Sequence, residues 1–343
     1  CYSKDNKKVE CDKMRQRILE VLRKRAPEPV SGEELSALLE VSRTAIWKHI
    51  QVLKNSGYII DSVPKKGYIL QSAPDRLRPE EVVTRLETKW LGHSINYDES
   101  VTSTNEVAKK LANAGCEDGL VCIAEEQVGG KGRLARVWFS PYAHGIWFSV
   151  VLKPPFMPSE ASKCTLLAAV AVVRAINEYT GVKAGIKWPN DILIDGKKMV
   201  GILTEMNAEF GHINYIVIGT GININVPKES LSDDLKDVVA SLADVTTKKI
   251  NRAELLALIL KNMEEFYELA ITEGFGPILD EWRWWSTTLG KEVKVVAPNE
   301  TYIGKALDID EDGLLIVERG GEKVKVIAGD VSIRSAQPEG GKY

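Results

Sequence analysis

The chain has 343 residues, which at roughly 150 residues per domain is enough for two or three domains. Hydrophobic residues make up 44% and charged residues 27%, which is ordinary globular usage and excludes a wholly disordered protein. The longest apolar runs, residues 145–152 and 165–173, are far shorter than the roughly 20 residues of a membrane-spanning helix, so a membrane-spanning protein is excluded.

The formal charge of −3 is distributed unevenly along the chain. Residues 1–76 carry 15 basic and 10 acidic side chains, a net charge of +5. Residues 77–343 carry 30 basic and 38 acidic side chains, a net charge of −8. This division favours contact with nucleic acid at the N-terminal end, although chance clustering of solvated charges would give the same numbers.

The cysteines and histidines argue against two kinds of stabilising site. Cysteines stand at positions 1, 11, 116, 122 and 164 without a CxxC pair, and the four histidines are scattered. This spacing argues against a disulfide scaffold and against a structural zinc site. No signal-peptide pattern is present, so we expect a reducing, cytoplasmic location and no membrane partner.

The first elements predict a DNA-binding motif. Residues 13–26 place their apolar side chains on one face of a short helix. Ser31 and Ser42 are suited to cap two further helices, the second of which stops at Gly57. Two short helices joined by a tight turn indicate a helix-turn-helix at about residues 32–51.

The next segment, residues 58–70, reads as a hairpin around Pro64-Lys65-Lys66-Gly67, which completes a winged helix. In this motif the second helix enters the major groove and a basic hairpin contacts phosphate. The expected DNA contacts are Ser42, Arg43, Thr44, Trp47 and Lys48 on the helix and Lys65 and Lys66 on the hairpin. Winged helices also serve as protein-binding modules, which is the alternative.

After a linker near Pro74 and Pro79, helices and strands alternate irregularly. The patterns predict helices ending at Gly115 and Gly181, strands at about 120–127 and 215–224, and a hairpin around Asp195-Gly196. Strands paired by a hairpin, with helices between others, favour a mixed sheet of the α+β class over a doubly wound parallel sheet.

The sharpest chemical feature is the segment VGGKGRLARVWFS at residues 128–140. Its three glycines expose backbone N–H groups, and Lys131, Arg133 and Arg136 add positive charge, as binding of a nucleotide phosphate requires. A β-prone stretch follows instead of a helix, which argues against a dinucleotide fold, and no Gly-Lys precedes Ser or Thr, which excludes a P-loop. A basic, flexible surface loop is the alternative for this segment alone.

The C-terminal part begins with a long amphipathic helix at residues 251–274, capped by Asn251 with Glu254 three residues on. Beyond residue 285, short strands separated by Pro298-Asn299, Asp312-Gly313 and Gly320-Gly321 predict a small β-barrel. We interpret Trp282, Trp284 and Trp285 as core between two domains.

The basic glycine loop resembles the GRGRxGR-type loop of biotin protein ligases. SVTSTNE, KWPND with DGKKMVGIL, and IGTGINI resemble the other ligand-site segments of that family in the same order. With the winged helix, the resemblance extends over nearly the whole chain and is to the bifunctional ligase and biotin operon repressor type. Lys131 and Ala135 depart from it, since the family more often has Arg and Gly there, and this puts retention of the intermediate in doubt.

The resemblance implies a multidomain α+β fold. It comprises a winged helix at residues 1–75, a mixed-sheet catalytic domain like class II aminoacyl-tRNA synthetases and lipoate ligases at 76–285, and an SH3-like barrel at 286–343. It implies formation of biotinyl-5′-AMP from biotin and ATP with Mg²⁺, and transfer of biotin to a lysine of a biotin carboxyl carrier protein domain. It also implies adenylate-dependent repression at operator DNA by a ligand-promoted homodimer.

The resemblance also assigns roles to residues of this sequence. The catalytic side chains implied are Arg133, Arg136, Lys187 and Lys198. The biotin-binding residues implied are Ser103, Thr104, Asn105, Gln127, Lys131, Gly132, Arg133 and Lys198. The adenylate-binding residues implied are Trp138, Asn190, Gly201 and Asn223, with Asp191 as a contact for Mg²⁺.

Simpler structural roles remain open at several of these positions. Asp191 can be a turn aspartate that fixes the start of a strand, and Lys187 a strand lysine that faces solvent. Ser103 and Thr104 can cap a helix, alone or together with ligand binding. For the whole chain, the alternatives are a biotin-sensing repressor without ligase activity and an enzyme of the lipoate ligase group, against which KWPND and the basic loop argue.

Overall fold

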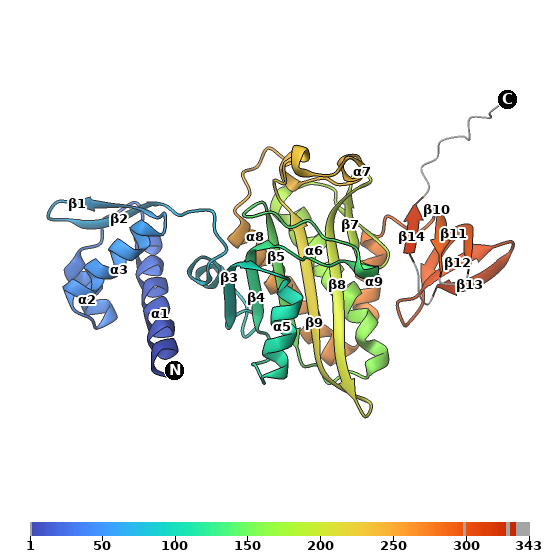
Figure 1. Ribbon diagram of the computed structural model, residues 1–343, viewed down its shortest axis with the longest axis horizontal. Helices are drawn as coiled ribbons and strands as arrows, with labels where there is room; N and C mark the ends of the chain where they lie inside the picture. Colours follow the sequence, from blue (N-terminus) through green and yellow to red (C-terminus); the bar gives the residue numbers. More distant parts are fainter. Residues whose placement is uncertain (1, 298–299, 327–329, 334–343) are drawn as a thin grey trace.

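The computed structural model describes residues 2–297, 300–326 and 330–333. Figure 1 shows three parts in a row: an N-terminal helical module with a hairpin, a central sheet covered by helices, and a small C-terminal sheet. Among the described residues, no helix combines the length and apolarity that crossing a membrane would take.

The N-terminal module is the predicted winged helix. Its elements are α1 (Tyr2–Arg25), α2 (Gly32–Leu39), α3 (Arg43–Asn55), β1 (Ile59–Val63) and β2 (Gly67–Ser72). Ser31 Oγ accepts from Glu34 N at 3.0 Å and Ser42 Oγ from Ala45 N at 3.2 Å, so both caps are confirmed. Helix α1 begins earlier than expected because residues 2–12 contain no helix breaker, although they lack the apolar stripe that marked the rest.

The apolar stripes of the three helices meet in one core that includes Ile18, Leu35 and Ile50, each fully buried. The hairpin is attached to this core through Val30, whose backbone exchanges two hydrogen bonds with Tyr68 at 2.8 and 2.9 Å. Gly67 closes the hairpin turn at φ +119°, where an added Cβ would lie 2.0 Å from Val30 O. Only glycine fits there, so Gly67 allows the hairpin to pack closely against the backbone of Val30.

The central part contains one seven-stranded sheet in the order β3-β4-β5-β9-β8-β7-β6. Its strands are β3 (Ile95–Val101), β4 (Val121–Gln127), β5 (Gly145–Leu152), β6 (Gly185–Lys187), β7 (Asp191–Ile194), β8 (Lys197–Glu209) and β9 (His212–Asn223). Strands β3 and β4 are parallel and the other neighbours are antiparallel. The predicted mixed α+β sheet is therefore confirmed.

Helices cover the two faces of this sheet unequally. The helical segments are α4 (Pro79–Val82), η1 (Val83–Arg85), α5 (Thr104–Asn113), η2 (Arg133–Ala135), η3 (Pro158–Glu160), α6 (Ala161–Thr180), η4 (Lys228–Ser230), α7 (Asp233–Lys236), η5 (Leu242–Asp244), α8 (Arg252–Glu273) and α9 (Gly276–Trp285). Helices α6, α8 and α9 share the main core with the sheet. On the other face, α5 packs mainly on β4, β5 and β9, which leaves part of the face over β8 and the end of β9 open for a site.

The C-terminal sheet has the order β13-β12-β11-β10-β14. Its strands are β10 (Glu292–Val296), β11 (Thr301–Ile309), β12 (Leu315–Arg319), β13 (Glu322–Val326) and β14 (Asp330–Ile333). The expected turn at residues 298–299 lies outside the described residues. Trp188 donates from Nε1 to Gly313 O at 3.0 Å, so the sheet contacts the KWPND segment directly. The interpretation of three core tryptophans was wrong for one: Trp282 is fully buried, whereas Trp284 is 79% exposed.

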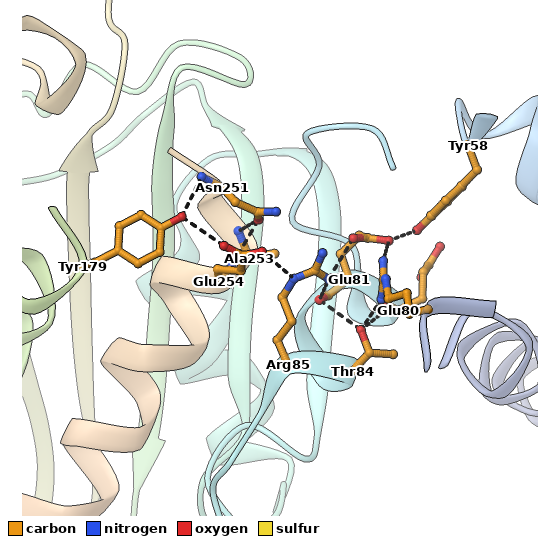
Figure 2. A network of polar contacts seen from close by, with 10 residues as sticks. Tyr58, Glu80, Glu81, Thr84, Arg85, Tyr179, Asn251, Ala253 and Glu254 are labelled. Atoms are coloured by element: carbon orange, nitrogen blue, oxygen red, sulfur yellow. Dashed lines mark hydrogen bonds and ion pairs between the residues drawn. The ribbon is translucent and has the colours of Figure 1, made fainter. Parts of the chain in front are cut away.

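The N-terminal module is joined to the central part by a polar network around Glu81 (Figure 2). The Glu81 carboxylate, 2% exposed, accepts hydrogen bonds from Tyr58, Arg23 and Arg85. Tyr58 and Arg23 belong to the winged helix, whereas Glu81 lies in α4. A buried carboxylate that binds donors from both sides fixes the relative orientation of the two parts.

The same network reaches α8 on the far side, as Figure 2 also shows. Arg85 Nε lies 3.8 Å from Glu254 Oε1, and Tyr179 donates to Glu254 Oε2 at 3.1 Å. The predicted cap at Asn251 is confirmed, since its side chain accepts from the backbone of residues 253 and 254. Glu254 contacts Arg85 and Tyr179 and forms no capping box, because tertiary partners compete for its carboxylate.

Candidate active site

A cavity of about 470 Å³ opens on the exposed half of the central sheet, beside the N-terminus of α5. This volume lies within the range of small-molecule sites. Every site residue expected in the central part lines it, although these residues are up to 120 positions apart in the sequence. They are Ser103, Thr104, Asn105, Gln127, Lys131, Gly132, Arg133, Arg136, Trp138, Lys187, Asn190, Asp191, Lys198, Gly201 and Asn223.

The first wall of the cavity combines a helix start with a strand end. Ser103 occupies the N-cap position of α5 but makes no side-chain capping hydrogen bond. Gln127, at the end of β4, supplies the cap: its Oε1 accepts from Thr104 N at 2.8 Å and lies 3.1 Å from Thr104 Oγ1. Because the cap comes from another element, Ser103 Oγ is not committed to the backbone of α5 and lies at the cavity.

Asn105 is held by three neighbours beneath this wall. Its Oδ1 accepts from Ser149 at 2.6 Å, and its Nδ2 donates to Glu205 Oε2 at 2.7 Å. A Cβ added to Gly219 would lie 2.0 Å from Asn105 Oδ1, so the side chain lies flat against β9 where glycine admits it. Asn105 and Ser149 are buried, which gives the cavity a rigid polar floor.

The basic loop crosses the mouth of the cavity. Gly132 N donates to Arg136 O at 2.7 Å, and Trp138 N donates to Gly130 O at 2.9 Å, so the loop folds back on itself. Arg133 Nη1 lies 3.5 Å from Asn190 Oδ1 on the opposite wall, which brings the loop to the KWPND segment. The side chain of Ala135, where the sequence departs from the family pattern, lies outside the described part.

Two lysines share one carboxylate at the end of the cavity. Lys198 Nζ lies 2.7 Å from Asp191 Oδ1, and Lys187 Nζ lies 3.6 Å from Asp191 Oδ2. Both lysines are partly buried, since their side chains are 32% and 23% exposed. Lys187 lies at the cavity and contacts Asp191, as its expected role requires.

This arrangement bears on the expected Mg²⁺ contact. Both oxygens of Asp191 face lysine ammonium groups, whose charge opposes a cation at the same oxygens. Within the described residues, no group of three or more His, Cys, Asp and Glu side chains is placed to hold a metal ion. The protein groups here do not fit a dedicated Mg²⁺ site, and the geometry favours the structural role of Asp191 at the start of β7.

Trp138 forms the adjacent wall and lies over β8 and β9. A Cβ added to Gly201 would lie 2.9 Å from its ring, and one added to Gly221 would lie 2.2 Å from its Nε1. The absence of a side chain at Gly201 and Gly221 lets this indole lie against the sheet. Lys198 Nζ lies 5.2 Å from the Trp138 ring centroid, and Asn223, 4% exposed, lies near the end of the same wall.

The apolar wall of the cavity was missed by sequence reasoning. It comes from the segment after β9, where Leu231, Leu235 and Val239 line the cavity. Backbone hydrogen bonds fix the segment beside β8, from Lys198 N to Val238 O at 2.7 Å and from Ala240 N to Lys198 O at 3.0 Å. The spacing of four residues between these apolar positions was the available signal.

The residues expected to contact DNA are separate from this cavity. One of them is the N-cap of α3, four lie on α3 itself and two lie on the wing. All seven are exposed: Ser42, Arg43, Thr44, Trp47, Lys48, Lys65 and Lys66. Trp47 is 53% exposed, which is unusual for a tryptophan that serves only the core. The face is basic, polar and open, as a nucleic-acid surface requires.

Three family models match successive parts of the chain. Residues 15–69 match an HTH domain, residues 97–223 match the biotin/lipoate A/B protein ligase family, and residues 288–334 match the biotin protein ligase C terminal domain. The helix-turn-helix, the catalytic-domain class and the C-terminal module predicted from the sequence are thereby confirmed.

Curated relatives are similar in sequence to this chain over almost its whole length. The bifunctional ligase/repressor BirA of Bacillus subtilis (strain 168) is 39% identical over 93% of this chain and 98% of its own. The protein of the same name from Escherichia coli (strain K12) is 30% identical over 90% of this chain and 94% of its own. Nothing among these relatives favours a repressor without ligase activity.

A solved structure shares the fold of most of this chain. The biotin protein ligase from Aquifex aeolicus in complex with biotin and ATP has a TM-score of 0.62 and 27% identity, covering 71% of this chain and 99% of that one. Together with the near full-length relatives, this shows that the chain belongs to the family of bifunctional biotin protein ligases and repressors.

Proposed function

We propose that the chain joins biotin to ATP at this cavity, transfers biotin to a lysine of a carrier protein, and represses transcription when the adenylate is bound. The observation that carries the proposal is the cavity itself, which combines a small polar floor with five cations at its mouth and far end. A polar floor suits a neutral, hydrogen-bonding head group, and the cations suit a carboxylate and phosphates.

In the first step a biotin carboxylate oxygen attacks the α-phosphorus of ATP. A P–O bond forms while the bond to pyrophosphate breaks. Both reactants are anions, so the site must lower their repulsion and stabilise the charge that grows on the phosphoryl oxygens. We assign this work to Arg133, Arg136, Lys187 and Lys198.

The two ends of the cavity take the two ends of the adenylate. Ser103, Thr104, Asn105 and Gln127 bind the ureido head of biotin, while Lys131 and Gly132 close over the ligand. At the other end, Trp138 stacks on adenine beside Asn223, and Asn190 and Gly201 line the nucleotide. The apolar wall of Leu231, Leu235 and Val239 excludes water from the acyl phosphate.

In the second step a carrier lysine amine attacks the acyl carbon. A C–N bond forms, the bond to AMP breaks, and the amine releases a proton to solvent. The carrier lysine must enter the mouth of the cavity to reach the acyl carbon. The basic loop therefore has to move aside or leave room for this side chain. We expect Mg²⁺ to arrive with the ATP phosphates, because Asp191 is already engaged by lysines.

For repression, we propose that the adenylate orders the loop and promotes dimerisation through sheet edges of the central domain. Strand β3 is an edge strand of the sheet, and its residues 98–100 are exposed. An edge strand offers unpaired backbone groups to a second copy. The dimer then presents two winged helices to two half-sites of an operator.

We place this activity in the cytoplasm, where ATP and carrier proteins are available, and we divide the chain at about residues 75 and 285. The core of the winged helix extends to Ala73, and the central core begins at Leu77, which supports the first limit. Helix α9 ends at Trp285, before the first C-terminal strand, which supports the second.

Radiolabelled biotin, incubated with ATP, the full chain and a biotin carrier domain, tests the ligase. We expect label on the carrier lysine, and none when ATP is omitted. Binding to operator DNA without any label transfer would establish the ligase-inactive alternative instead. For the repressor, Arg43→Ala should weaken operator binding while label transfer continues, and unchanged operator binding would remove Arg43 from the DNA interface.

A further inference from the structure

The basic loop is tied to helix α5 by one side-chain contact. Lys131 Nζ lies 3.0 Å from Glu106 Oε1. Glu106 stands in the first turn of α5, directly after Thr104 and Asn105 of the cavity wall. The side chain of Lys131 therefore contacts α5 at the rim of the cavity, and Glu106 is a residue to which neither the sequence patterns nor the resemblance assigned a role.

This contact belongs to a chain of alternating charges that leads to the cavity floor. Lys109 Nζ lies 3.0 Å from Glu106 Oε1 and 2.8 Å from Glu205 Oε1. Glu205 Oε2 in turn accepts from Asn105 Nδ2 at 2.7 Å. The order Lys131, Glu106, Lys109, Glu205, Asn105 joins the loop at the mouth to the buried amide at the floor.

The charges in this network stabilise one another at neutral pH. Hydrogen bonds from Lys109 and then Lys131 lower the pKa of Glu106, which is therefore ionised. Burial alone would lower the pKa of Lys109, but its hydrogen bonds to Glu205 and Glu106 outweigh burial and raise it. Lys109 and Glu205 are about one-quarter and one-third exposed, so they are less screened than Lys131 and Glu106 at the rim.

The loop makes few other contacts that would hold it against α5. Leu134 at its tip is 72% exposed, and Val137 is 84% exposed, so apolar burial contributes little there. Its backbone hydrogen bonds to residues outside 128–140 lie at its two ends. Val128 N donates to Val101 O and Gly129 N to Thr102 O, each at 2.9 Å, and Gln127 N donates to Ser140 O at 3.1 Å. Arg133 holds the loop to Asn190 across the cavity, and on the α5 side the pair of Lys131 and Glu106 is placed to limit how far the loop opens.

We propose that Glu106 is a positioning residue that anchors the basic loop through Lys131 and thereby sets how long the site retains the biotinyl-adenylate. The inference rests on the proposed ligase function. It also gives Lys131 a partner that suits it: a compact ammonium bonds one carboxylate oxygen, where an arginine would offer a planar fork. Exposed ion pairs change an equilibrium by up to about fivefold, which bounds the expected effect.

Hydrogen–deuterium exchange of residues 129–137 in the ligand-free full chain tests the anchor. Glu106→Gln and Lys131→Gln should each speed exchange by about two- to fivefold, and the double variant should be no faster than the faster single one. Glu117→Gln removes an exposed charge beyond the other end of α5 and should leave exchange unchanged. Unaltered exchange in Glu106→Gln, or additive effects in the double variant, would overturn the proposal.

Two further readouts separate an ion pair from a merely structural effect. Raising NaCl from about 0.05 to 0.5 M should speed loop exchange in the parent chain but not in Glu106→Gln, because salt screens the pair. Glu106→Asp, which keeps the charge, should restore most of the protection. Equal salt dependence in both proteins would count against the anchor.

Retention is measured by chasing a preformed adenylate complex with excess unlabelled biotin. We expect Glu106→Gln to release the adenylate about two- to fivefold faster than the parent chain. Release at the parental rate from a variant whose loop exchanges faster would refute the link between anchor and retention. Failure of the parent chain to form any adenylate would instead refute the ligase proposal, while the exchange experiment would still decide the anchor.

Discussion

Lys198 Nζ lies 2.7 Å from Asp191 Oδ1, so a lysine assigned to phosphate binding is paired with a carboxylate of the same cavity. Lys187 lies on the other oxygen of this carboxylate at 3.6 Å. Part of the positive charge is therefore neutralised in the ligand-free protein. The incoming phosphates compete with Asp191 for both ammonium groups, and this competition makes two opposite predictions for the carboxylate and for the lysine.

Replacing Asp191 by Asn should strengthen nucleotide binding, because it frees two lysines for the phosphates. We expect the Kd for ATP to fall about two- to fivefold in titration calorimetry at fixed Mg²⁺, with the Mg²⁺ dependence of label transfer unchanged. A rise of about tenfold or more in the Mg²⁺ needed for transfer would contradict this and would make Asp191 a metal ligand.

Replacing Lys198 by Met should slow adenylate formation by roughly 10²–10³-fold, the usual cost of removing one charge-stabilising donor. Biotin-dependent pyrophosphate exchange measures this step. Lys197→Met is the matched control, since alternation along β8 directs its side chain to the other face. Similar losses in the two variants would show that charge anywhere on this strand suffices.

Replacing Gly221 by Ala should displace Trp138, because the new Cβ would lie 2.2 Å from the indole Nε1. We expect ATP binding to weaken by at least tenfold, with biotin binding retained, since Asn105 and Ser149 lie at the other end of the cavity. Gly276→Ala is the control, as a Cβ there meets nothing within 4 Å. Undiminished ATP affinity would remove Trp138 from the adenine site.

Replacing Glu81 by Gln should loosen the winged helix from the central part, because Arg23 and Arg85 lose their shared carboxylate. We expect a loss of about 1–3 kcal/mol in docking free energy, observed as faster proteolysis of the linker around residues 73–78. Glu87→Gln, which breaks only an exposed pair with Lys261, should have little effect. Equal proteolysis of both variants would show that Glu81 does not fix the orientation.

The pH dependence of the winged helix should show a contribution from His49. Burial first, and then the charge of Arg15, lower the pKa of His49 below its ordinary value of 6.5. The unfolded chain thus binds the proton more readily, so stability is full above about pH 6.5 and falls as pH drops through the lower, folded pKa. His49→Gln should flatten the fall in melting temperature between pH 7 and 5.5, and an unchanged slope would exclude this histidine as its source.

Much of the fold follows from local patterns. Ser31, Ser42 and Asn251 cap their helices as expected, because a capping side chain acts on its own backbone two or three residues on. Gly181 ends α6 in the left-handed conformation for the same local reason. The expected pairing of Glu254 with Asn251 in the cap was wrong, because the Glu254 carboxylate contacts Arg85 and Tyr179 from other segments.

The sequence by itself determined the order of the three parts, the basic winged helix and the types of side chain that we propose to bind an acyl adenylate, because each depends on residues near one another in the chain. The tertiary structure decided which of those types meet. In the folded chain, Gln127 caps α5, Leu231 and Leu235 line the cavity, and Lys131 pairs with Glu106. Such contacts join segments 20 or more residues apart, and their geometry is set by how the sheet and helices pack.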